Sequence, residues 1–302
     1  MKLKKIHDII HTKDKKTVQE VEMKIKEVLY KSIEILKENN IEEPVIKARI
    51  LLAYLLGVEK EYLVIHSEDE ISENVEKEFL EKIKEIVNGK PLQHITNHVE
   101  FMKLDFYVDE NVLIPRQDTE ILVEEVINFC KENSNYKYKI LDLCSGSGAI
   151  GISLAKYINN AQVICTDISD KAIEIAKRNA RNNGIKNITF KKSDMFEKIT
   201  ENFDIIVSNP PYIKRKLITK LDKEVQKEPI IALDGGKDGL DFYKIIVNEA
   251  YKHLNKSGKI FLEIGYDQKQ EVIELIKKSN KYKEVYSKQD LYANDRIVVA
   301  SI

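Results

Sequence analysis

Residues 140–151 have the sequence Ile-Leu-Asp-Leu-Cys-Ser-Gly-Ser-Gly-Ala-Ile-Gly, in which a short apolar run leads through a glycine-rich turn into a helix-like segment. Glycine adopts backbone conformations that other residues avoid, and it lets a ligand approach the backbone closely. Gly146, Gly148 and Gly151 also satisfy the G-x-G-x-x-G spacing of dinucleotide sites. A tight turn without any ligand is common between a strand and a helix. The turn therefore locates a candidate site without identifying its ligand.

Strand-like and helix-like segments alternate around this turn, from residue 120 to the C-terminus. Such alternation predicts an α/β fold with a mostly parallel sheet, covered by helices on both faces, that binds ligands at the carboxyl ends of its strands. The last two strands have little helix between them, which predicts an antiparallel closing pair. The expected strands are 139–143, 162–166, 188–191, 203–208, 259–264, a strand near 285, and 296–301, and the expected helices are 149–157, 172–182, 240–254 and 268–278.

The first part of the chain has a different periodicity. From 17 to 86, apolar residues recur at three- and four-residue intervals, which predicts a small all-α bundle. Ser72 is expected to cap a helix, and Gly57 to end one. Between the two parts, the strand-like runs 100–108 and 112–114 are expected to pair as a hairpin. We therefore predict a helical domain at 1–90, a linker hairpin at 91–115 and an α/β domain at 116–302.

Composition excludes several classes of protein. Of the 302 residues, 43% are hydrophobic and 33% charged, and no apolar run approaches the roughly 20 residues of a membrane span. The 49 Lys and Arg nearly balance the 50 Asp and Glu, so no strong field would hold nucleic acid stably. Three cysteines without metal-like spacing, and no secretory signal at the start, indicate reduced thiols in a cytoplasmic protein without a metal site.

Acidic residues follow successive predicted strands and favour a particular ligand chemistry. Asp142 would repel a pyrophosphate and suits a cationic ligand such as S-adenosylmethionine, which carries a sulfonium and an ammonium. Asp167 can accept both hydroxyls of a ribose, a feature shared by sites for NAD and for S-adenosylmethionine. Asp194 can accept from an adenine amino group, with Met195 and Phe196 either flanking the ring or belonging to the core.

The segment Asn209-Pro-Pro-Tyr212 follows the predicted strand 203–208. Its prolines rigidify the turn and leave carbonyl oxygens free to accept hydrogen bonds. A planar NH2 group that donates to Asn209 Oδ1 and to the Pro210 carbonyl would have its lone pair directed at a methyl carbon, while the Tyr212 ring packs on the planar group. The predicted chemistry is therefore methyl transfer to an amide or base nitrogen by positioning alone.

These motifs together resemble a known family. The glycine-rich turn with Asn-Pro-Pro-Tyr is similar to class I methyltransferases, and the segments 48–57, 113–120, 228–240 and 262–265 look like the HemK-type glutamine N5-methyltransferases of peptide chain release factors. The resemblance implies a Rossmann-like class I fold with an N-terminal helical domain that grips the release factor. It also implies methyl transfer from S-adenosylmethionine to the glutamine of a Gly-Gly-Gln loop, with S-adenosylhomocysteine as the product.

Site residues follow from both lines of reasoning. The predicted cofactor contacts are Asp142, Cys144, Ser145, Gly146, Ser147, Gly148, Asp167, Asp194, Met195 and Asn209. The predicted substrate-binding residues are Asn209, Pro210, Pro211 and Tyr212, of which Asn209, Pro210 and Tyr212 are expected to be catalytic. Cys144 stands where many members have glycine, and Met195 where an aromatic residue is frequent, so the resemblance is weaker at these two positions.

Other interpretations stay open at this point. The enzyme could act on a glutamine of a ribosomal protein, or on adenine N6 of a nucleic acid, since Asn-Pro-Pro-Tyr also suits a flipped base. A non-catalytic module that binds a nucleotide or a release factor is a third alternative. Asp118 or Thr119 is expected to cap the helix that follows, and the alternative is a lid over the cofactor. We expect a monomer.

Overall fold

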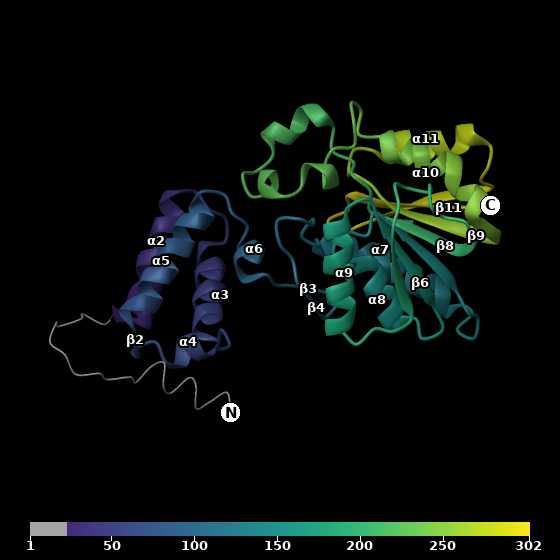
Figure 1. Ribbon diagram of the computed structural model, residues 1–302. Helices are drawn as coiled ribbons and strands as arrows, with labels where there is room; N and C mark the ends of the chain where they lie inside the picture. The colour runs from purple at the N-terminus through teal and green to yellow at the C-terminus, as the bar shows by residue number, and fades with distance from the viewer. Residues whose placement is uncertain (1–22) are drawn as a thin grey trace. The chain divides into compact units, whose positions relative to one another are not determined.

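The computed structural model describes residues 23–302, which divide into two compact units, 23–96 and 97–302 (Figure 1). Each has a hydrophobic core of its own. Among the described residues, none of the helices has both the length and the apolar character needed to cross a bilayer.

The first unit is a helical bundle, as predicted. Its main helices α2 (Ile25–Glu38), α3 (Pro44–Leu56) and α5 (Glu73–Val87) bury apolar faces against one another (Figure 1). Shorter helices α4 (Tyr62–Ile65) and α6 (Leu92–Thr96) and a two-stranded pair of β1 (Met23–Lys24) with β2 (Glu70–Ile71) complete the unit. The part of the predicted helical pattern at 17–22 lies outside the described residues.

Two predicted helix boundaries in this unit are confirmed. The Ser72 hydroxyl accepts from the Val75 backbone N–H and so caps α5. Gly57 ends α3 with a φ of 66°, in the left-handed region where glycine carries no steric penalty.

The hairpin after the bundle differs from the prediction. It pairs β3 (Val99–Phe101) with β4 (Leu104–Phe106), entirely inside the run that we predicted as one strand, and 112–114 forms no strand. The turn consists of Met102 and Lys103, both with positive φ, as a two-residue type I′ turn requires. Neither residue belongs to the Asn, Asp and Gly types that signal this turn, so the sequence pattern did not reveal it.

The second unit is built on a seven-stranded sheet in the order β10-β11-β9-β8-β5-β6-β7. The first five of these strands in the chain are mutually parallel, whereas β11 runs antiparallel to both β9 and β10. This confirms the mostly parallel sheet with an antiparallel closing pair. The strands are β5 (Lys139–Leu143), β6 (Gln162–Asp167), β7 (Ile188–Lys192), β8 (Phe203–Ser208), β9 (Leu254–Glu263), β10 (Glu284–Gln289) and β11 (Asp295–Ser301).

Helices cover both faces of the sheet (Figure 1). Successive side chains of a strand point to opposite faces of the sheet, so apolar residues at consecutive positions give both faces a core. Ile140 and Val207 pack in one core cluster, while Leu141 and Ile206 pack in the other. On the first face lie α7 (Glu120–Lys131), α8 (Ala149–Tyr157) and α9 (Asp170–Asn182), and on the second α10 (Asp241–Glu249) and α11 (Lys269–Ser279). The predicted helix 240–254 ends earlier than expected, in the 3₁₀ turn Ala250–His253, and Leu254 already starts β9.

The sheet order reverses direction at β5, whose neighbours are β6 and β8. Chain connections leave β5 and β8 toward opposite sides, which opens a crevice beyond the carboxyl ends of these strands. The glycine-rich turn follows β5, and Asn-Pro-Pro-Tyr follows β8. The fold thus brings the two main predicted motifs to adjacent strand ends.

Candidate functional site

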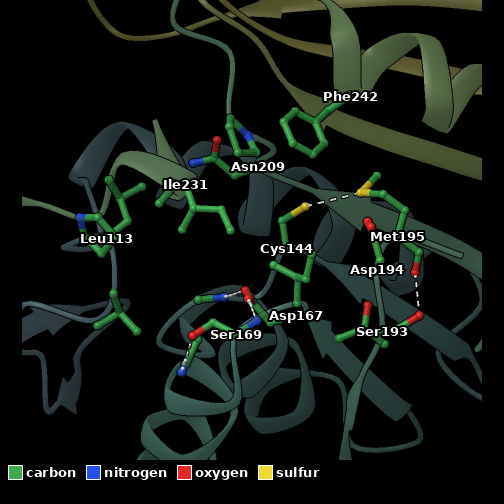
Figure 2. Close-up of a pocket in the computed structure, with 18 of the residues that line it drawn as sticks. Leu113, Cys144, Asp167, Ser169, Ser193, Asp194, Met195, Asn209, Ile231 and Phe242 are labelled. Carbon is green, nitrogen blue, oxygen red and sulfur yellow. Dashed lines mark hydrogen bonds between the residues drawn. The ribbon is translucent and has the colours of Figure 1, made fainter. Parts of the chain in front are cut away.

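A cavity of about 350 Å³ lies at this edge of the sheet. Four consecutive strand ends contribute to its wall, through Cys144, Asp167, Met195 and Asn209 in chain order. Figure 2 shows these side chains around a common space, with Asn209 and Phe242 on one side and Asp167 and Ser169 on the opposite side. The wall is mostly apolar with a few polar groups, as is typical of a small-molecule site.

The glycine-rich turn approaches this cavity with its backbone. Gly146 has a φ of 53°, and a Cβ built on it would meet nothing within 4 Å, so the space in front of it is open. Its N–H donates to Asp167 Oδ2 at 2.9 Å, which ties the turn after β5 to the end of β6. Glycine is required at position 151 for a different reason. A Cβ there would lie 2.2 Å from Cys165 Sγ. Glycine at this position permits close packing of α8 on the sheet.

Asp142 lies beneath the turn rather than in the cavity wall. It is fully buried, and its Oδ2 accepts from the Gly151 N–H at 2.9 Å. Burial raises the pKa of Asp142 to about 7, against the opposing effect of the Gly151 hydrogen bond. Its Oδ1 has no hydrogen-bond partner among the described residues. The side chain therefore braces the strand-to-helix turn, and its contact with a ligand remains a prediction.

Asp167 lies in the wall, at the end of β6. Its two oxygens accept from the N–H groups of Gly146 and Ser169, both at 2.9 Å. Burial raises its pKa above the ordinary value, although these backbone hydrogen bonds oppose the shift. A carboxylate has about four acceptor positions, so this arrangement leaves capacity for the hydroxyls of a ligand.

Residues after β7 form a further part of the wall. Asp194 is exposed, and Met195 is buried with its Sδ 3.8 Å from Cys144 Sγ. Both Cys144 and Met195 have positive φ, at 58° and 42°. Phe196 does not line this cavity but stacks on His253, with ring centroids 5.3 Å apart. Of the two ring-flanking candidates, only Met195 is therefore placed beside the cavity.

The Asn-Pro-Pro-Tyr segment contributes Asn209 and Pro211 to the wall, while Pro210 and Tyr212 do not line it. The Tyr212 backbone carbonyl accepts from Gln268 Nε2 at 3.0 Å, which holds the end of the segment. Asn209 Nδ2 donates to the Thr119 hydroxyl at 3.3 Å. Ser145, Ser147 and Gly148 also lie outside the wall, although they shape the turn that contributes Cys144 and Gly146.

The capping role expected for Asp118 and Thr119 is wrong. Thr119 precedes α7 without any side-chain capping hydrogen bond, because its hydroxyl is engaged by Asn209 instead. Asp118 pairs with Arg296 at 3.0 Å. Partners that lie far away in the sequence thus compete successfully with the local backbone for these two side chains.

Sequence reasoning missed one side of the wall. Leu113, Ile231 and Phe242 line the cavity, although none of the three was predicted as a site residue (Figure 2). They lie in the segments 113–120 and 228–240 and in the predicted helix 240–254. The buried Glu228 links two of these segments, because its carboxylate accepts from the Ile114 N–H at 2.8 Å and from the Arg116 guanidinium. Leu113 lies outside regular structure, Ile231 in a 3₁₀ turn and Phe242 in α10. No periodic pattern distinguishes an apolar residue that lines a cavity from an ordinary apolar one, which explains the omission.

Comparison with known proteins places both parts of the chain. A model described as "Methyltransferase domain" matches residues 132–296, and one described as "PrmC N-terminal domain" matches residues 27–96. A protein named "Release factor glutamine methyltransferase" from Clostridium acetobutylicum is 43% identical over 283 residues, covering 92% of this chain and 98% of that protein. A protein of the same name from Clostridium botulinum is 39% identical, covering 92% of this chain and 99% of that protein.

A solved structure supports the fold independently. The hMettl16 catalytic domain, crystallised in complex with MAT2A 3′UTR hairpin 6, superposes with a TM-score of 0.55 at 16% identity, covering 71% of this chain and 83% of that chain. At this identity the likeness concerns the fold alone.

Proposed function

This chain belongs to the family of release factor glutamine methyltransferases, and from that premise we propose that it methylates the side-chain N5 amide of the glutamine in the Gly-Gly-Gln loop of peptide chain release factors. The observation that carries the proposal is the position of Asn209 in the cavity wall, with its Nδ2 engaged by Thr119. An amide held in this way has its acceptor Oδ1 as the remaining atom for hydrogen bonding.

The cavity suits S-adenosylmethionine. Its wall offers open backbone at Gly146, acceptors at Asp167 and Asp194, and apolar surface at Met195. We propose that Asp167 binds the ribose hydroxyls and Asp194 the adenine amino group, with Cys144 and Asn209 also in contact. Asp142, Ser145, Ser147 and Gly148 would act by shaping the turn. Bound there, S-adenosylmethionine supplies an electrophilic methyl carbon on its sulfonium sulfur.

The chain itself supplies orientation. In this proposal Asn209 Oδ1 and the Pro210 carbonyl accept the two hydrogens of the glutamine NH2, so the nitrogen lone pair faces the methyl carbon. Pro211 and Tyr212 confine the flat amide. Fixing two reactants in a near-attack geometry is worth an effective molarity of about 10⁵–10⁸ M, so a weak amide nucleophile needs no strong base.

The helical unit is the proposed recognition domain for the release factor. Its core is formed by residues of 23–96, and residues 27–96 match the model described as "PrmC N-terminal domain". We further propose a monomeric, cytoplasmic enzyme that forms no stable complex with nucleic acid. A substrate that works in translation fits this location.

The substrate is tested by competition. Labelled S-adenosylmethionine is incubated with the enzyme and a mixture of release factor, ribosomal protein and DNA in equal amounts. The position of the label is then mapped by mass spectrometry. Label on the glutamine of Gly-Gly-Gln is the expected result. Label on a ribosomal-protein glutamine or on adenine would refute the proposal, and so would no transfer to any of the three.

Asn209→Ala tests the role of orientation. The variant is expected to keep its affinity for S-adenosylmethionine within about tenfold while losing at least about 10²-fold in kcat, because it removes an acceptor for the substrate amide. Calorimetric titration and steady-state assays measure the two quantities. Unchanged turnover would contradict the role given to Asn209.

A further inference from the structure

Resting on the proposed function, we infer that Thr119 and Glu263 are positioning residues that hold the Asn209 carboxamide in the orientation in which Oδ1 faces the substrate. A carboxamide has two nearly isosteric orientations, with its oxygen and nitrogen exchanged. Only one of them presents an acceptor to a substrate NH2. The enzyme therefore needs groups behind Asn209 that distinguish its nitrogen from its oxygen.

The hydrogen bonds behind Asn209 make this distinction. Asn209 Nδ2 donates to Thr119 Oγ1 at 3.3 Å. The Glu263 carboxylate lies close enough to Thr119 and Asn209 for both side chains to favour its ionised form. An ionised carboxylate accepts hydrogen bonds only. The Thr119 hydroxyl can donate its single hydrogen to Glu263, which leaves its oxygen as an acceptor for Asn209. Both partners thus favour the Asn209 nitrogen and disfavour its oxygen.

The fold holds these three residues together. Asn209 directly follows β8 and Glu263 is the last residue of β9, and these strands pair with Ser208 opposite Leu262. Thr119 immediately precedes α7 and is 5% exposed, while Glu263 is 2% exposed. The Tyr243 hydroxyl donates to the Glu263 backbone carbonyl at 2.9 Å. The buried Thr119 and Glu263 therefore lie behind the half-buried Asn209, at the ends of regular elements.

Charges around Glu263 come from several elements. Arg296 of β11 stabilises the Glu263 carboxylate, Asp118 opposes it, and Arg296 is itself paired with Asp118 and Asp290, each at 3.0 Å. The Glu263 carboxylate also lies close enough to Tyr212 and Tyr243 for its charge to raise the pKa of both hydroxyls. Burial dominates and raises the pKa of Glu263 to about 7. Glu263 Oε2 has no hydrogen-bond partner among the described residues, an unusual arrangement for a group with a purely structural role.

Protonation would weaken the distinction, because a protonated Glu263 can donate a hydrogen bond to the wrong end of the amide. Turnover in the wild type should therefore rise with pH through about 7. Glu263→Gln, whose side chain does not titrate and can donate, should lower kcat and remove this rise. The difference between the two pH profiles isolates Glu263 from Asp142, which has a similar pKa.

Thr119→Val and Thr119→Ser form the matched pair for the main test. Valine keeps the shape of threonine but lacks the hydroxyl, whereas serine keeps the hydroxyl. We expect Thr119→Val to lower kcat by about 10-fold to 10²-fold at unchanged affinity for S-adenosylmethionine, and Thr119→Ser to restore most of the turnover. Release-factor methylation gives kcat, calorimetric titration gives the affinity, and thermal unfolding reports folding.

The outcomes separate this inference from the proposed function. A wild-type enzyme that fails to methylate the release factor refutes the proposed function. An active wild type whose Thr119→Val variant turns over normally refutes the positioning role alone. If Thr119→Val does not fold, the Glu263→Gln variant is the test of the inference. A Glu263→Gln variant with the kcat of the wild type and the same pH dependence of turnover would overturn it.

Discussion

Two carboxylates near the site, Asp142 and Glu263, are buried and have their pKa raised to about 7. In the folded state these carboxyl groups keep their protons to higher pH than in the unfolded chain. At a pH between the unfolded and the folded pKa, the folded state therefore binds more protons. The free energy of unfolding should therefore receive a contribution from them that falls as pH rises from about 4 to about 7. Their burial favours the neutral form, which is the physical cause of this sign.

Asp142→Asn tests this prediction. Denaturant unfolding of the wild type and the variant is compared across this range of pH. The stability of the wild type relative to the variant should decline as pH increases, because asparagine does not ionise. A relative stability that is constant or increases with pH would contradict the burial effect.

The three cysteines are predicted to resist thiol reagents in the folded protein. Burial raises the pKa of Cys130 to about 12, and it raises the pKa of Cys144 and Cys165 as well. The thiolate is the reactive form, so alkylation at neutral pH should be slow for all three until the protein is unfolded. Mass spectrometry after a timed exposure to iodoacetamide measures this. Rapid alkylation of Cys144 without denaturant would show that its thiol is accessible and ionised.

Prediction from sequence was uneven among residues. The acidic residues Asp167 and Asp194 could be placed because a strand end fixes where its next residues lie. Thr119 was misassigned because a hydroxyl before a helix resembles a cap, whereas its partner Asn209 lies 90 positions away in the sequence. Glu263 was predicted only as part of the strand 259–264 and of a family motif, without a role in the site. Partnerships of this kind depend on tertiary structure, which a local pattern does not contain.

Among the elements, the turn that carries Asn-Pro-Pro-Tyr is supported from behind by a second loop. A Cβ at Gly235 would lie 2.7 Å from Tyr212 Cα and 2.8 Å from the Pro211 carbonyl oxygen, so only glycine allows this approach. The Gly235 N–H also donates to the Ile213 carbonyl at 2.9 Å. The position of the substrate turn therefore depends on this contact.

Gly235→Ala should displace the turn and lower kcat by about 10²-fold, since small displacements of reacting groups have effects of that size. Gly258→Ala is the matched control. A Cβ at Gly258 would also lie 2.8 Å from a backbone oxygen, that of Asn255. Gly258 lies in β9 beside the start of β8, whereas the site lies at the carboxyl ends of these strands. The control should lose stability and keep its kcat. Equal losses of turnover in both variants would show that Gly235 acts through general stability.

At the level of elements, the parallel strands and their helices could be predicted because each has a clear period and length. The hairpin at 99–106 could not be predicted. Its turn residues Met102 and Lys103 adopt positive φ, although this conformation is usually found at Gly, Asn or Asp. Their conformation is supported by tertiary contacts, since the Met102 N–H donates to Glu120 Oε1 and its carbonyl accepts from the Tyr157 hydroxyl, both at 2.6 Å.

For the whole molecule, the two units have separate cores, which predicts separable functions. A fragment of residues 97–302 should fold, bind S-adenosylmethionine, and methylate a short Gly-Gly-Gln peptide at the rate of the full chain. Its KM for an intact release factor should rise at least about tenfold, because the proposed recognition unit is missing. Steady-state assays on the two substrates test this. An unchanged KM for the release factor would contradict the recognition role of the helical unit.

The arrangement of Asn209 toward its substrate is tested most directly by a crystal structure of the enzyme with S-adenosylhomocysteine and a Gly-Gly-Gln peptide. The glutamine nitrogen should lie within hydrogen-bond distance of both Asn209 Oδ1 and the Pro210 carbonyl, with Asn209 Nδ2 still directed at Thr119. A glutamine amide bound elsewhere, or an Asn209 carboxamide with its nitrogen toward the substrate, would contradict the account.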